Sequence, residues 1–337
     1  MKTASGSRAK TTAIYAFMIT AFFLSMLVSM RFGAVDLSVG DIAGALANGP
    51  GSTEHTIFYK VRLPRVMLGA VAGAGLAMVG AVMQGIFQNP LVDSYTLGMS
   101  SGASLGAVIA IVTGISAKIP GISTLSAFAF MGAVGTLTFV YFLSSRSGKV
   151  STSSLLLSGI VVSYFISALI SILMMLNSDK IESIVFWNMG SIAGATWTKT
   201  AVAAGVIIPC TFILYYFWRE LNMMSFGEES ASSLGVNTAR TKIILLLTSS
   251  LIVGTVVSVG GTIGFVGLIA PHIARYFTGA ENRKLLFLSA LTGSVTLMLA
   301  DTLGRLLTRP AEIPVGVMTA VIAGPLFIYL LRKNGRK

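Results

Sequence analysis

The side chains that could carry out chemistry are few in this sequence, and they are widely scattered. The 337 residues include 12 Asp and Glu, two His and one Cys. His55 and His272 are far apart and lack the spacing typical of metal ligands, while Cys210 lies alone in an apolar run. No GxxxxGK[ST] phosphate loop occurs, and no His–Asp–Ser or paired-carboxylate arrangement stands out. These observations argue against an enzyme and predict no metal site and no cofactor bound by this chain.

Two adjacent acids, Glu228 and Glu229, stand in a polar segment between two long apolar runs, SFGEESASSLGV at residues 225–236. Ser225 and Glu228 have the spacing of a capping box, in which each side chain bonds a free backbone N–H group at a helix start. Acids in a first turn favour the helix dipole, and Gly235 fits the position just past a helix end. The segment is therefore predicted to form a short, capped helix.

One edge of this predicted helix is semi-apolar. Phe226, Ser230 and Leu234 recur every four residues, so they lie one above another, with Ala231 beside Leu234. Such an edge suits either a connector that lies on the membrane surface or a docking surface for a partner protein. The residues themselves leave both interpretations open.

The composition is that of a membrane protein. Hydrophobic residues make up 54% of the chain and charged residues only 11%, with a mean hydropathy of +0.83. A soluble domain averages about 25% charged residues, because its surface faces water. The net charge of +12 does not indicate nucleic-acid binding, because the basic residues gather at the two tails and between apolar segments. We expect membrane lipid around the chain and no nucleic-acid partner.

Ten apolar stretches approach the length of about 20 residues that a membrane-spanning helix needs. They lie at residues 13–32, 66–87, 94–113, 122–143, 152–176, 200–218, 242–260, 262–277, 285–304 and 313–331. The seventh and eighth are separated only by VGGTIG and the eighth is short, so nine or eleven spans are the alternatives. No linker or low-complexity segment interrupts the chain. The prediction is a single all-α transmembrane domain over residues 1–337.

The basic residues orient these spans. An even count of spans puts both tails on one side, and fifteen of the 24 Lys and Arg residues then lie on the tail side. Because basic residues concentrate on the cytoplasmic side, both termini and the loop at about residues 219–240 are predicted to be cytoplasmic. The chain is thus expected to be a multi-pass protein of the cell (plasma or inner) membrane.

Polar side chains crowd the end of the second predicted span, where Asn89-Pro90 should interrupt the helix because proline disfavours a helical conformation in the residue before it. At membrane depth such groups line a cavity or are buried in protein. The polar set comprises Gln84, Gln88, Asn89, Asp93 and Ser94. Glycines at 69, 73 and 80 and at 98, 102 and 106 predict that the second and third spans each pack tightly near the bundle centre.

Five blocks follow one another along the chain in a characteristic order. They are RLPR…GAVMQGIFQNPLVDSYTLGMSSGASLGA from Arg62, STSSLLLSG from Ser151, FGEESASSLGV from Phe226, GTIGFVGLIAPHIAR from Gly261 and LADTLGRLLTRPAEIPVGVMTAVIAGPLF from Leu299. Together they resemble the membrane permease subunits of the ABC importers for iron–siderophore, haem and cobalamin, the FecCD-like type II importers. The resemblance covers about residues 61–331.

This resemblance implies a function and a set of partners. Such permeases have ten helices with both termini in the cytoplasm, and two copies, identical or paralogous, form a central pathway. Two separate ATPase subunits bind ATP and Mg²⁺ and dock on the cytoplasmic side, while an extracytoplasmic binding protein delivers the chelate. The implied cargo is an iron(III)-siderophore or a related metal chelate such as haem or cobalamin.

The resemblance also implies roles for particular residues. The ATPase-coupling helix would present Glu228, Ser230 and Leu234. Arg62, Arg65 and Arg305 would face acidic residues of the binding protein. The cytoplasmic gate would involve Asn89, Leu91, Thr152 and Ser153.

Simpler interpretations of the same residues stay open. Arg62 and Arg65 could anchor to lipid headgroups, and Ser151 to Ser154 read as an ordinary helix start. Asp301 stands four residues before Arg305 and could pair with it, and an exposed pair of that kind is worth about 0.5 kcal/mol.

Two other classes of function compete with an ABC permease. An ion-coupled secondary transporter usually buries functional acids near the membrane midplane, whereas Asp93 and Asp301 stand near the predicted span ends. A membrane-embedded enzyme would alter its substrate chemically. Dependence of uptake on a separate ATPase distinguishes the first rival, and an altered product the second.

Overall fold

The computed structural model describes residues 2–33, 35–47, 52–115, 123–146 and 149–334. Most of this part of the chain is helical, so the all-α prediction is confirmed. One small exception is a pair of two-residue strands, β1 (Ser145–Arg146) and β2 (Lys149–Val150), which pair antiparallel.

Ten longer helices form the body of the molecule. They are α1 (Lys2–Arg31), α4 (Leu63–Phe87), α5 (Met99–Thr113), α6 (Thr124–Ser144), α7 (Thr152–Leu176), α9 (Trp197–Tyr216), α12 (Thr238–Gly260), α13 (Val266–Thr278), α14 (Asn282–Leu307) and α15 (Val315–Asn334). Shorter elements connect them: α2 (Val39–Ala47), α3 (Thr53–His55), the π-helix η1 (Thr56–Arg62), the 3₁₀-helix η2 (Ser178–Lys180), α8 (Ile181–Asn188), α10 (Trp218–Met224) and α11 (Glu228–Ser233).

Seven of the described helices are long and apolar enough to cross a membrane. They are α1, the continuous run α3–η1–α4, α6, α7, α9, α12 and α14. Two shorter apolar helices, Met99–Thr113 and Val315–Pro325, together with α13, cover the remaining predicted spans. The chain is thus a multi-span membrane protein, while helix length and composition do not confirm the predicted count of ten.

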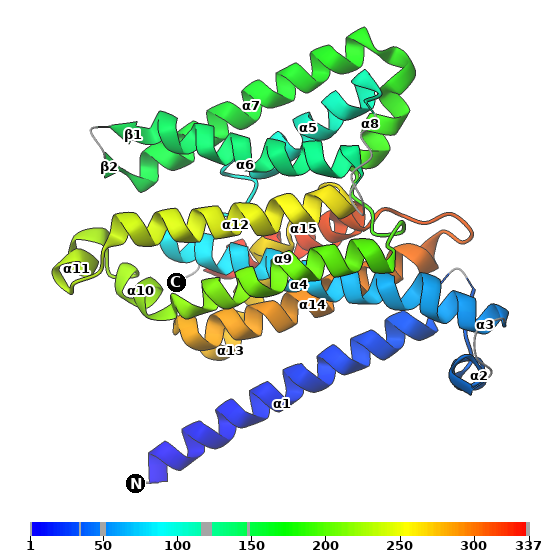
Figure 1. Cartoon of the computed structure of the whole chain (residues 1–337). Coiled ribbons are helices and arrows are strands. Elements are labelled where there is room, and N and C mark those ends of the chain that lie inside the picture. Colours follow the sequence, from blue (N-terminus) through cyan, green and yellow to red (C-terminus); the bar gives the residue numbers. More distant parts are fainter. Residues whose placement is uncertain (1, 34, 48–51, 116–122, 147–148, 335–337) are drawn as a thin grey trace.

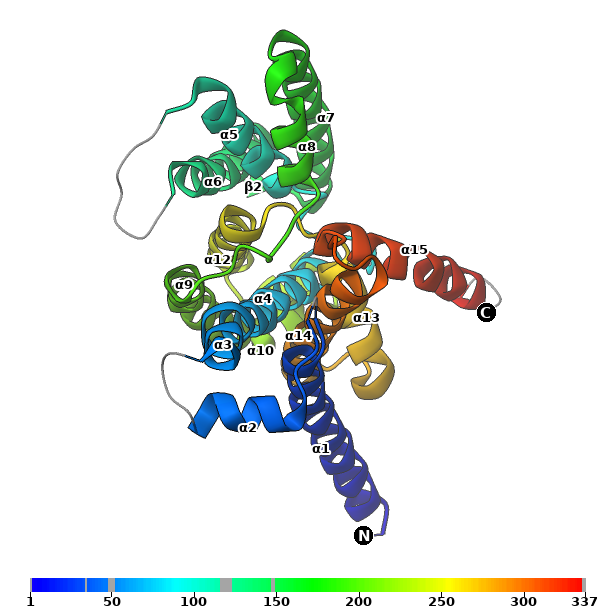
Figure 2. The ribbon, with the colours of Figure 1, turned by 90° about the vertical axis from the view of Figure 1, so that its right-hand side faces the viewer.

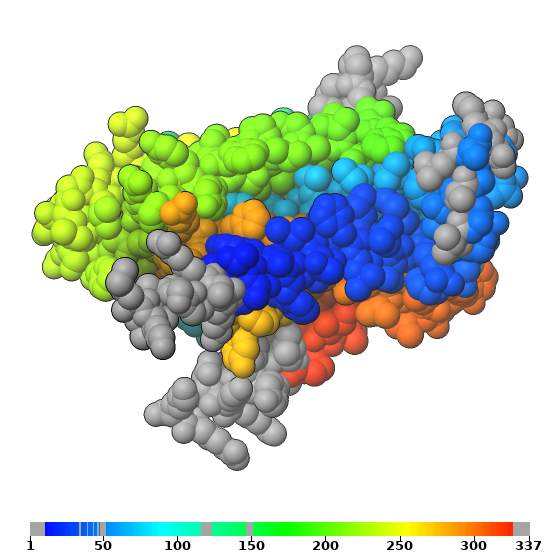
Figure 3. All heavy atoms as spheres, turned by 90° about the horizontal axis from the view of Figure 1, so that it is seen from below, coloured from blue at the N-terminus to red at the C-terminus, as the bar shows by residue number. Residues whose placement is uncertain are grey.

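The helices form two groups. Figure 2 shows α5, α6, α7 and α8 together at one side, with α12 next to them and α4, α9, α13 and α14 beyond. Figure 3 shows α1 lying across the surface of the group that contains α4, α9, α13 and α14, where it packs on α14. Helix α4 is the most enclosed of these helices, because α9, α12, α13 and α14 all contact it.

Close helix crossings explain the glycine pattern. A Cβ atom added to Gly80 would lie 1.7 Å from the carbonyl oxygen of Gly267 on α13, and one added to Gly73 would lie 2.3 Å from that of Gly293 on α14. On α5, the same test at Gly102 meets the carbonyl oxygen of Gly132 on α6 at 2.4 Å. Tight packing of both spans is confirmed, of α4 against α13 and α14 and of α5 against α6, because small residues let helix backbones approach each other in a membrane.

The two ends of the bundle differ. Figure 1 shows α10, α11, the β1–β2 pair, the start of α1 and the end of α15 toward one end, and α2, α3 and α8 at the other. Both tails and the 219–240 loop therefore share an end, as the basic residues predict. We call this the inner end, because the same residues assign it to the cytoplasm, and the opposite one the outer end.

Helix α4 ends where the sequence predicts. Gln88 follows its last residue in the left-handed conformation, with φ of 49°, and Asn89-Pro90 comes next. The described chain then runs through an irregular segment to α5, which begins at Met99. This segment holds two residues of the predicted gate.

Candidate coupling site and arginine network

Helix α11 begins differently from the prediction. Ser225 lies at the end of α10, where its Oγ donates to the carbonyl oxygen of Leu221 at 2.9 Å. Gly227, with φ of 103°, precedes the first residue of α11, Glu228. The predicted capping box is therefore wrong, because α10 extends far enough to occupy Ser225 and a glycine makes the turn between the two helices.

The other end of α11 matches the prediction. Gly235 has φ of 88°, and its N–H donates to the carbonyl oxygen of Ser232 at 2.9 Å. The N–H of Val236 reaches back to Ala231 at 3.0 Å, which completes a Schellman motif. Ala231 is fully buried, so α11 is fixed to the body of the protein through one face.

The side chain of Glu228 is partly exposed and contacts two neighbouring helices. Its Oε1 accepts a hydrogen bond of 3.1 Å from Thr152 Oγ1, at the start of α7. The same oxygen forms an ion pair with the Nζ of Lys242, a buried residue near the start of α12. Glu228 thus joins α11 to two transmembrane helices, and Thr152 is one of the predicted gate residues. The sequence does not indicate a role for Lys242, because nothing in its spacing from Glu228 predicts a contact.

The other predicted gate segment also contacts this region. Gln88 donates through Nε2 to the carbonyl oxygen of Met224, the last residue of α10, at 2.7 Å. Asn89 accepts the N–H of Leu91 at 2.9 Å, which shapes the turn, and the Leu91 side chain is exposed. In the described part of the chain no hydrogen bond joins this segment to Thr152 or to Ser153, which is exposed. The α10–α11 unit is what links the two segments.

The edge of α11 that faces away from the rest of the protein is open to solvent. Phe226 is 79% exposed and Leu234 66%, and Ser230 between them is also exposed. Phe226 and Leu234, with Ser230 between them, form a largely apolar exposed strip beside the acidic first turn, where Glu229 is exposed as well. Of the three predicted coupling residues, Ser230 and Leu234 therefore face outward, while Glu228 contacts neighbouring helices and keeps its side chain 36% exposed.

The three predicted binding-protein arginines gather at the outer end of the bundle, inside the protein. Arg62, Arg65 and Arg305 are only 4%, 6% and 3% exposed. Arg65 holds Asp301 with two nitrogens, through Nε at 2.9 Å and Nη2 at 2.8 Å, and its Nη2 also lies 2.8 Å from Glu312. A partner could reach these guanidinium groups only if they left their present contacts.

The remaining two arginines complete this network. Arg62 donates through Nη1 to the carbonyl oxygens of Met30 and Arg31, both at 2.6 Å, at the end of α1. Arg305 lies 3.2 Å from Asp301, so the pair considered in the sequence analysis does form. It is buried and shared with a second arginine, however, and not the exposed pair expected. The network holds the outer ends of α1, α4 and α14 together.

A further ion pair ties two outer loops. Arg309 contacts both carboxylate oxygens of Asp36, at 2.7 and 3.0 Å. The hydrogen bond from this guanidinium holds the pKa of Asp36 below its ordinary value. No sequence pattern predicts this contact, because the two residues are 273 positions apart.

A cavity of about 580 Å³ lies beside the 88–98 segment. Its lining joins that segment to the end of α8, the turn before α13 and the start of α15, through residues that include Tyr95, Asn188, Thr262, Phe265 and Val317. Most of the lining surface is apolar. In the described residues no cluster of three or more His, Cys, Asp or Glu side chains could hold a metal ion.

Comparisons with known proteins agree with this architecture. A family model described as the FecCD transport family matches residues 19–333. The Fe(3+)-citrate import system permease protein YfmD of Bacillus subtilis is 35% identical over 332 residues, which is 98% of each chain. The hemin transport system permease protein HmuU of Yersinia pestis is 38% identical over 61% of this chain and 62% of its own length. Several curated relatives are matched over only 55–62% of their length.

One solved structure is similar over almost the whole chain. It is described as an inward-facing conformation of a metal-chelate type ABC transporter, and it is 34% identical in sequence. The TM-score is 0.84, with 96% of this chain and 99% of the other covered.

Proposed function

This chain belongs to the FecCD transport family, and from that premise we propose that it is the membrane permease subunit of an ABC importer for an iron(III)-siderophore or a related metal chelate. Membership in a family of transport permeases makes it a multi-span transport subunit of the cell membrane and not an enzyme. Haem, ferric citrate and cobalamin are the cargoes named for its relatives.

The observation that carries the proposal is the pair of links from the α10–α11 unit to both predicted gate segments. One link is the Glu228–Thr152 hydrogen bond, and the other runs from Gln88 to the Met224 carbonyl. A force applied to α11 would therefore act on the start of α7 and on the segment after α4 together. This is the geometry that a motor protein outside the membrane would need in order to open and close a pathway.

The motor in this proposal is a separate ATPase, one copy of which docks on each permease. The exposed strip of Phe226, Ser230 and Leu234 offers it an apolar surface at the inner end. ATP and Mg²⁺ belong to that partner, and this chain holds neither. The ATPase shifts the permease between two conformations by binding them with different affinity.

The pathway itself requires a second copy, identical or paralogous. The 580 Å³ cavity between the 88–98 segment and the start of α15 supplies a mostly apolar wall. An apolar wall with few hydrogen-bonding or charged groups binds a bulky chelate weakly, and weak binding lets the cargo leave on the inner side. The chelate passes through chemically unchanged.

An extracytoplasmic binding protein delivers the cargo to the outer end. Arg62, Arg65 and Arg305 contact its acidic residues only if docking opens the arginine network around Asp301. Exposed cations at the same end include Arg31 and Lys60, which can steer an acidic partner without any rearrangement.

Reconstitution tests the proposal. The full-length chain is placed in proteoliposomes with its ATPase, the binding protein loaded with ⁵⁵Fe-siderophore is added, and iron uptake is followed with and without ATP. Uptake should require both the ATPase and ATP. Uptake by the chain alone, driven by a proton or sodium gradient, would show instead that it is a secondary transporter.

A further inference from the structure

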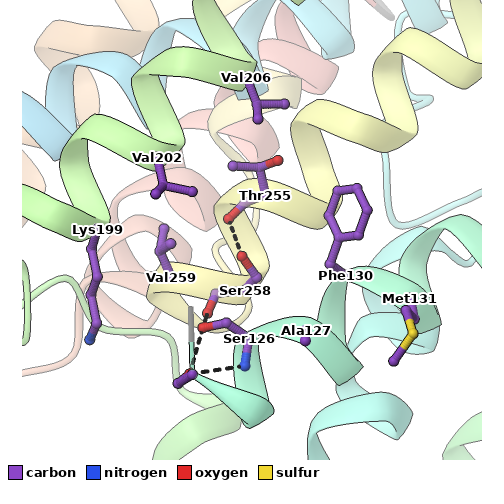
Figure 4. Close-up of a pocket in the computed structure, with 11 residues that line it drawn as sticks. Ser126, Ala127, Phe130, Met131, Lys199, Val202, Val206, Thr255, Ser258 and Val259 are labelled. Atoms are coloured by element: carbon purple, nitrogen blue, oxygen red, sulfur yellow. Dashed lines mark hydrogen bonds between the residues drawn. The ribbon is translucent and has the colours of Figure 1, made fainter. Parts of the chain in front are cut away.

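Two adjoining cavities open near the outer end of the bundle, between α6, α9 and α12. The first, about 280 Å³, is lined almost entirely by apolar surface, which includes Phe130 and Met131 of α6 and Val202 and Val206 of α9 (Figure 4). The second, about 210 Å³, lies beside it and has roughly equal polar and apolar lining. They share Ser123, Ser126, Lys199, Ser258 and Val259. Together they form one groove with a polar end and an apolar end.

The hydroxyl groups along the apolar cavity already have acceptors. Thr255 donates to the carbonyl oxygen of Leu251 at 2.6 Å, and Ser258 donates to that of Thr255 at 2.8 Å. Ser126 donates across the groove to the carbonyl oxygen of Ser258. Because each of these hydroxyl groups already donates to a carbonyl oxygen, an apolar ligand would leave no hydrogen bond unmade, and the groove suits a hydrocarbon chain.

Lys199 stands where the two cavities meet. Its Nζ donates to the carbonyl oxygen of Gly194 at 3.0 Å, and among the described residues no acidic side chain lies within 4.0 Å of it. Among the described residues that line the two cavities, it is the only charged one. An ammonium group has three donors, so two remain for a ligand. The polar end therefore carries an uncompensated positive charge.

The groove lies at the depth of one lipid leaflet. Lys199 and Val206 are seven residues apart on α9, which corresponds to about 10 Å along the helix, and one leaflet of the hydrocarbon core is about 15 Å thick. Trp197, two residues before Lys199 at the start of α9, is half-exposed and donates its indole N–H to the carbonyl oxygen of Tyr59, and Trp187 lines the polar cavity. Tryptophan favours the membrane–water interface, which puts the polar end at the headgroup level.

We propose that this groove is a binding site for an anionic phospholipid of the outer leaflet. One acyl chain lies along α9 between Phe130, Met131 and Val202, and Lys199 donates to the phosphate. The combination of an apolar groove, a single cation at its interfacial end and a length that fits one leaflet selects this occupant. The site is independent of the transport pathway proposed above.

Native mass spectrometry of the full-length chain in mild detergent tests the proposal. The protein is equilibrated with equal amounts of phosphatidylglycerol and phosphatidylcholine that carry the same acyl chains. Phosphatidylglycerol should be retained about fivefold more, the factor that one basic residue near an anionic headgroup supplies. Lys199→Gln should abolish this preference, whereas Lys180→Gln, at an exposed outer position away from the groove, should keep it.

A second variant tests the acyl chain. Val202→Trp fills the apolar cavity and should reduce retention of both lipids, while Ile208→Trp, exposed on α9 outside the cavity, should leave retention unchanged. Thermal melting checks that each variant is folded. The proposal is overturned if Lys199→Gln keeps the preference or if Val202→Trp retains lipid normally. It also fails if inorganic phosphate displaces the lipid, or if Val202→Trp changes the oligomeric state, which would make the groove a protein interface.

Discussion

Glu228 and Thr152 are joined by a hydrogen bond of 3.1 Å, although 76 residues separate them in sequence. The bond connects the first residue of a short inner-end helix to the first residue of α7. The same carboxylate oxygen pairs with Lys242 on α12, so one side chain ties three helices together. Glu228, predicted to contact a partner protein, therefore also links helices within the permease, and the predictions for α11 follow from that position.

Replacement of Glu228 should uncouple transport from ATP hydrolysis. Glu228→Lys removes the acceptor for Thr152 and puts a second cation beside the buried Lys242. Hydrogen bonds to a charged group are worth about 1.5–3 kcal/mol, so uptake per ATP hydrolysed should fall at least about tenfold. The measurement is chelate uptake and phosphate release in the same proteoliposomes.

Glu229→Lys is the matched control for this experiment. It makes the same charge change on the exposed side of the same helical turn. It should insert normally and keep most of the coupling. Normal transport by Glu228→Lys would contradict the role given to Glu228.

The two predicted gate residues at the start of α7 should differ. Thr152→Val keeps the shape of the side chain but loses the bond to the charged Glu228, so uptake per ATP should fall about tenfold or more. Ser153→Ala, at an exposed position, should have little effect. Equal losses in both variants would mean that Thr152 acts at the gate itself and not through α11.

The exposed strip of α11 should determine ATPase binding. Leu234→Asp places a charge in the middle of any apolar contact there, while the permease alone loses nothing because the side chain is 66% exposed. Co-purification of the ATPase should drop while the melting temperature of the isolated permease stays unchanged. A variant that still co-purifies its ATPase in full would exclude this edge as the docking surface.

The sequence is informative about this protein where a local pattern decides the structure. Apolar runs place the helices and the Asn89-Pro90 pair ends α4, because a lipid environment and a proline act on a single segment. Gly235 ends α11 for the same reason. The predicted capping box is wrong because Ser225 can either cap the start of α11 or end α10, and α10 extends far enough to take Ser225.

Local sequence patterns do not predict contacts between segments that are far apart in the chain. Glu228 and Lys242 are 14 residues apart and Arg65 and Asp301 are 236 apart, separations that reflect the folded packing alone. The sequence places Arg62, Arg65 and Arg305 near span ends, where arginines are commonly exposed. Whether such a side chain turns outward or inward depends on acids such as Asp301 that a neighbouring helix supplies.

The crossing of α4 and α13 should tolerate no side chain at Gly80. Gly80→Ala would force a Cβ atom to within 1.7 Å of the Gly267 carbonyl oxygen, so the helices must separate. Overpacking of this kind costs about 1–3 kcal/mol, and a backbone clash puts this site at the upper end. Gly135→Ala on α6 meets nothing within 4 Å and should be neutral or slightly stabilising. Thermal melting in detergent compares the two, and equal melting temperatures would argue against the close crossing.

The buried arginine network should make Asp301 a major contributor to stability. Asp301→Asn keeps the size of the side chain but removes the charge that faces both Arg65 and Arg305. Breaking a buried ion pair from one side costs about 3–5 kcal/mol, because the remaining cations stay desolvated. The control is Asp179→Asn, since Asp179 is 73% exposed at the same end and its contact with Lys180 is worth under about 1 kcal/mol. The melting temperature of Asp301→Asn should fall well below those of the wild type and the control. Equal melting temperatures would mean that the network opens easily, and Arg62, Arg65 and Arg305 would then be available to a binding protein after all.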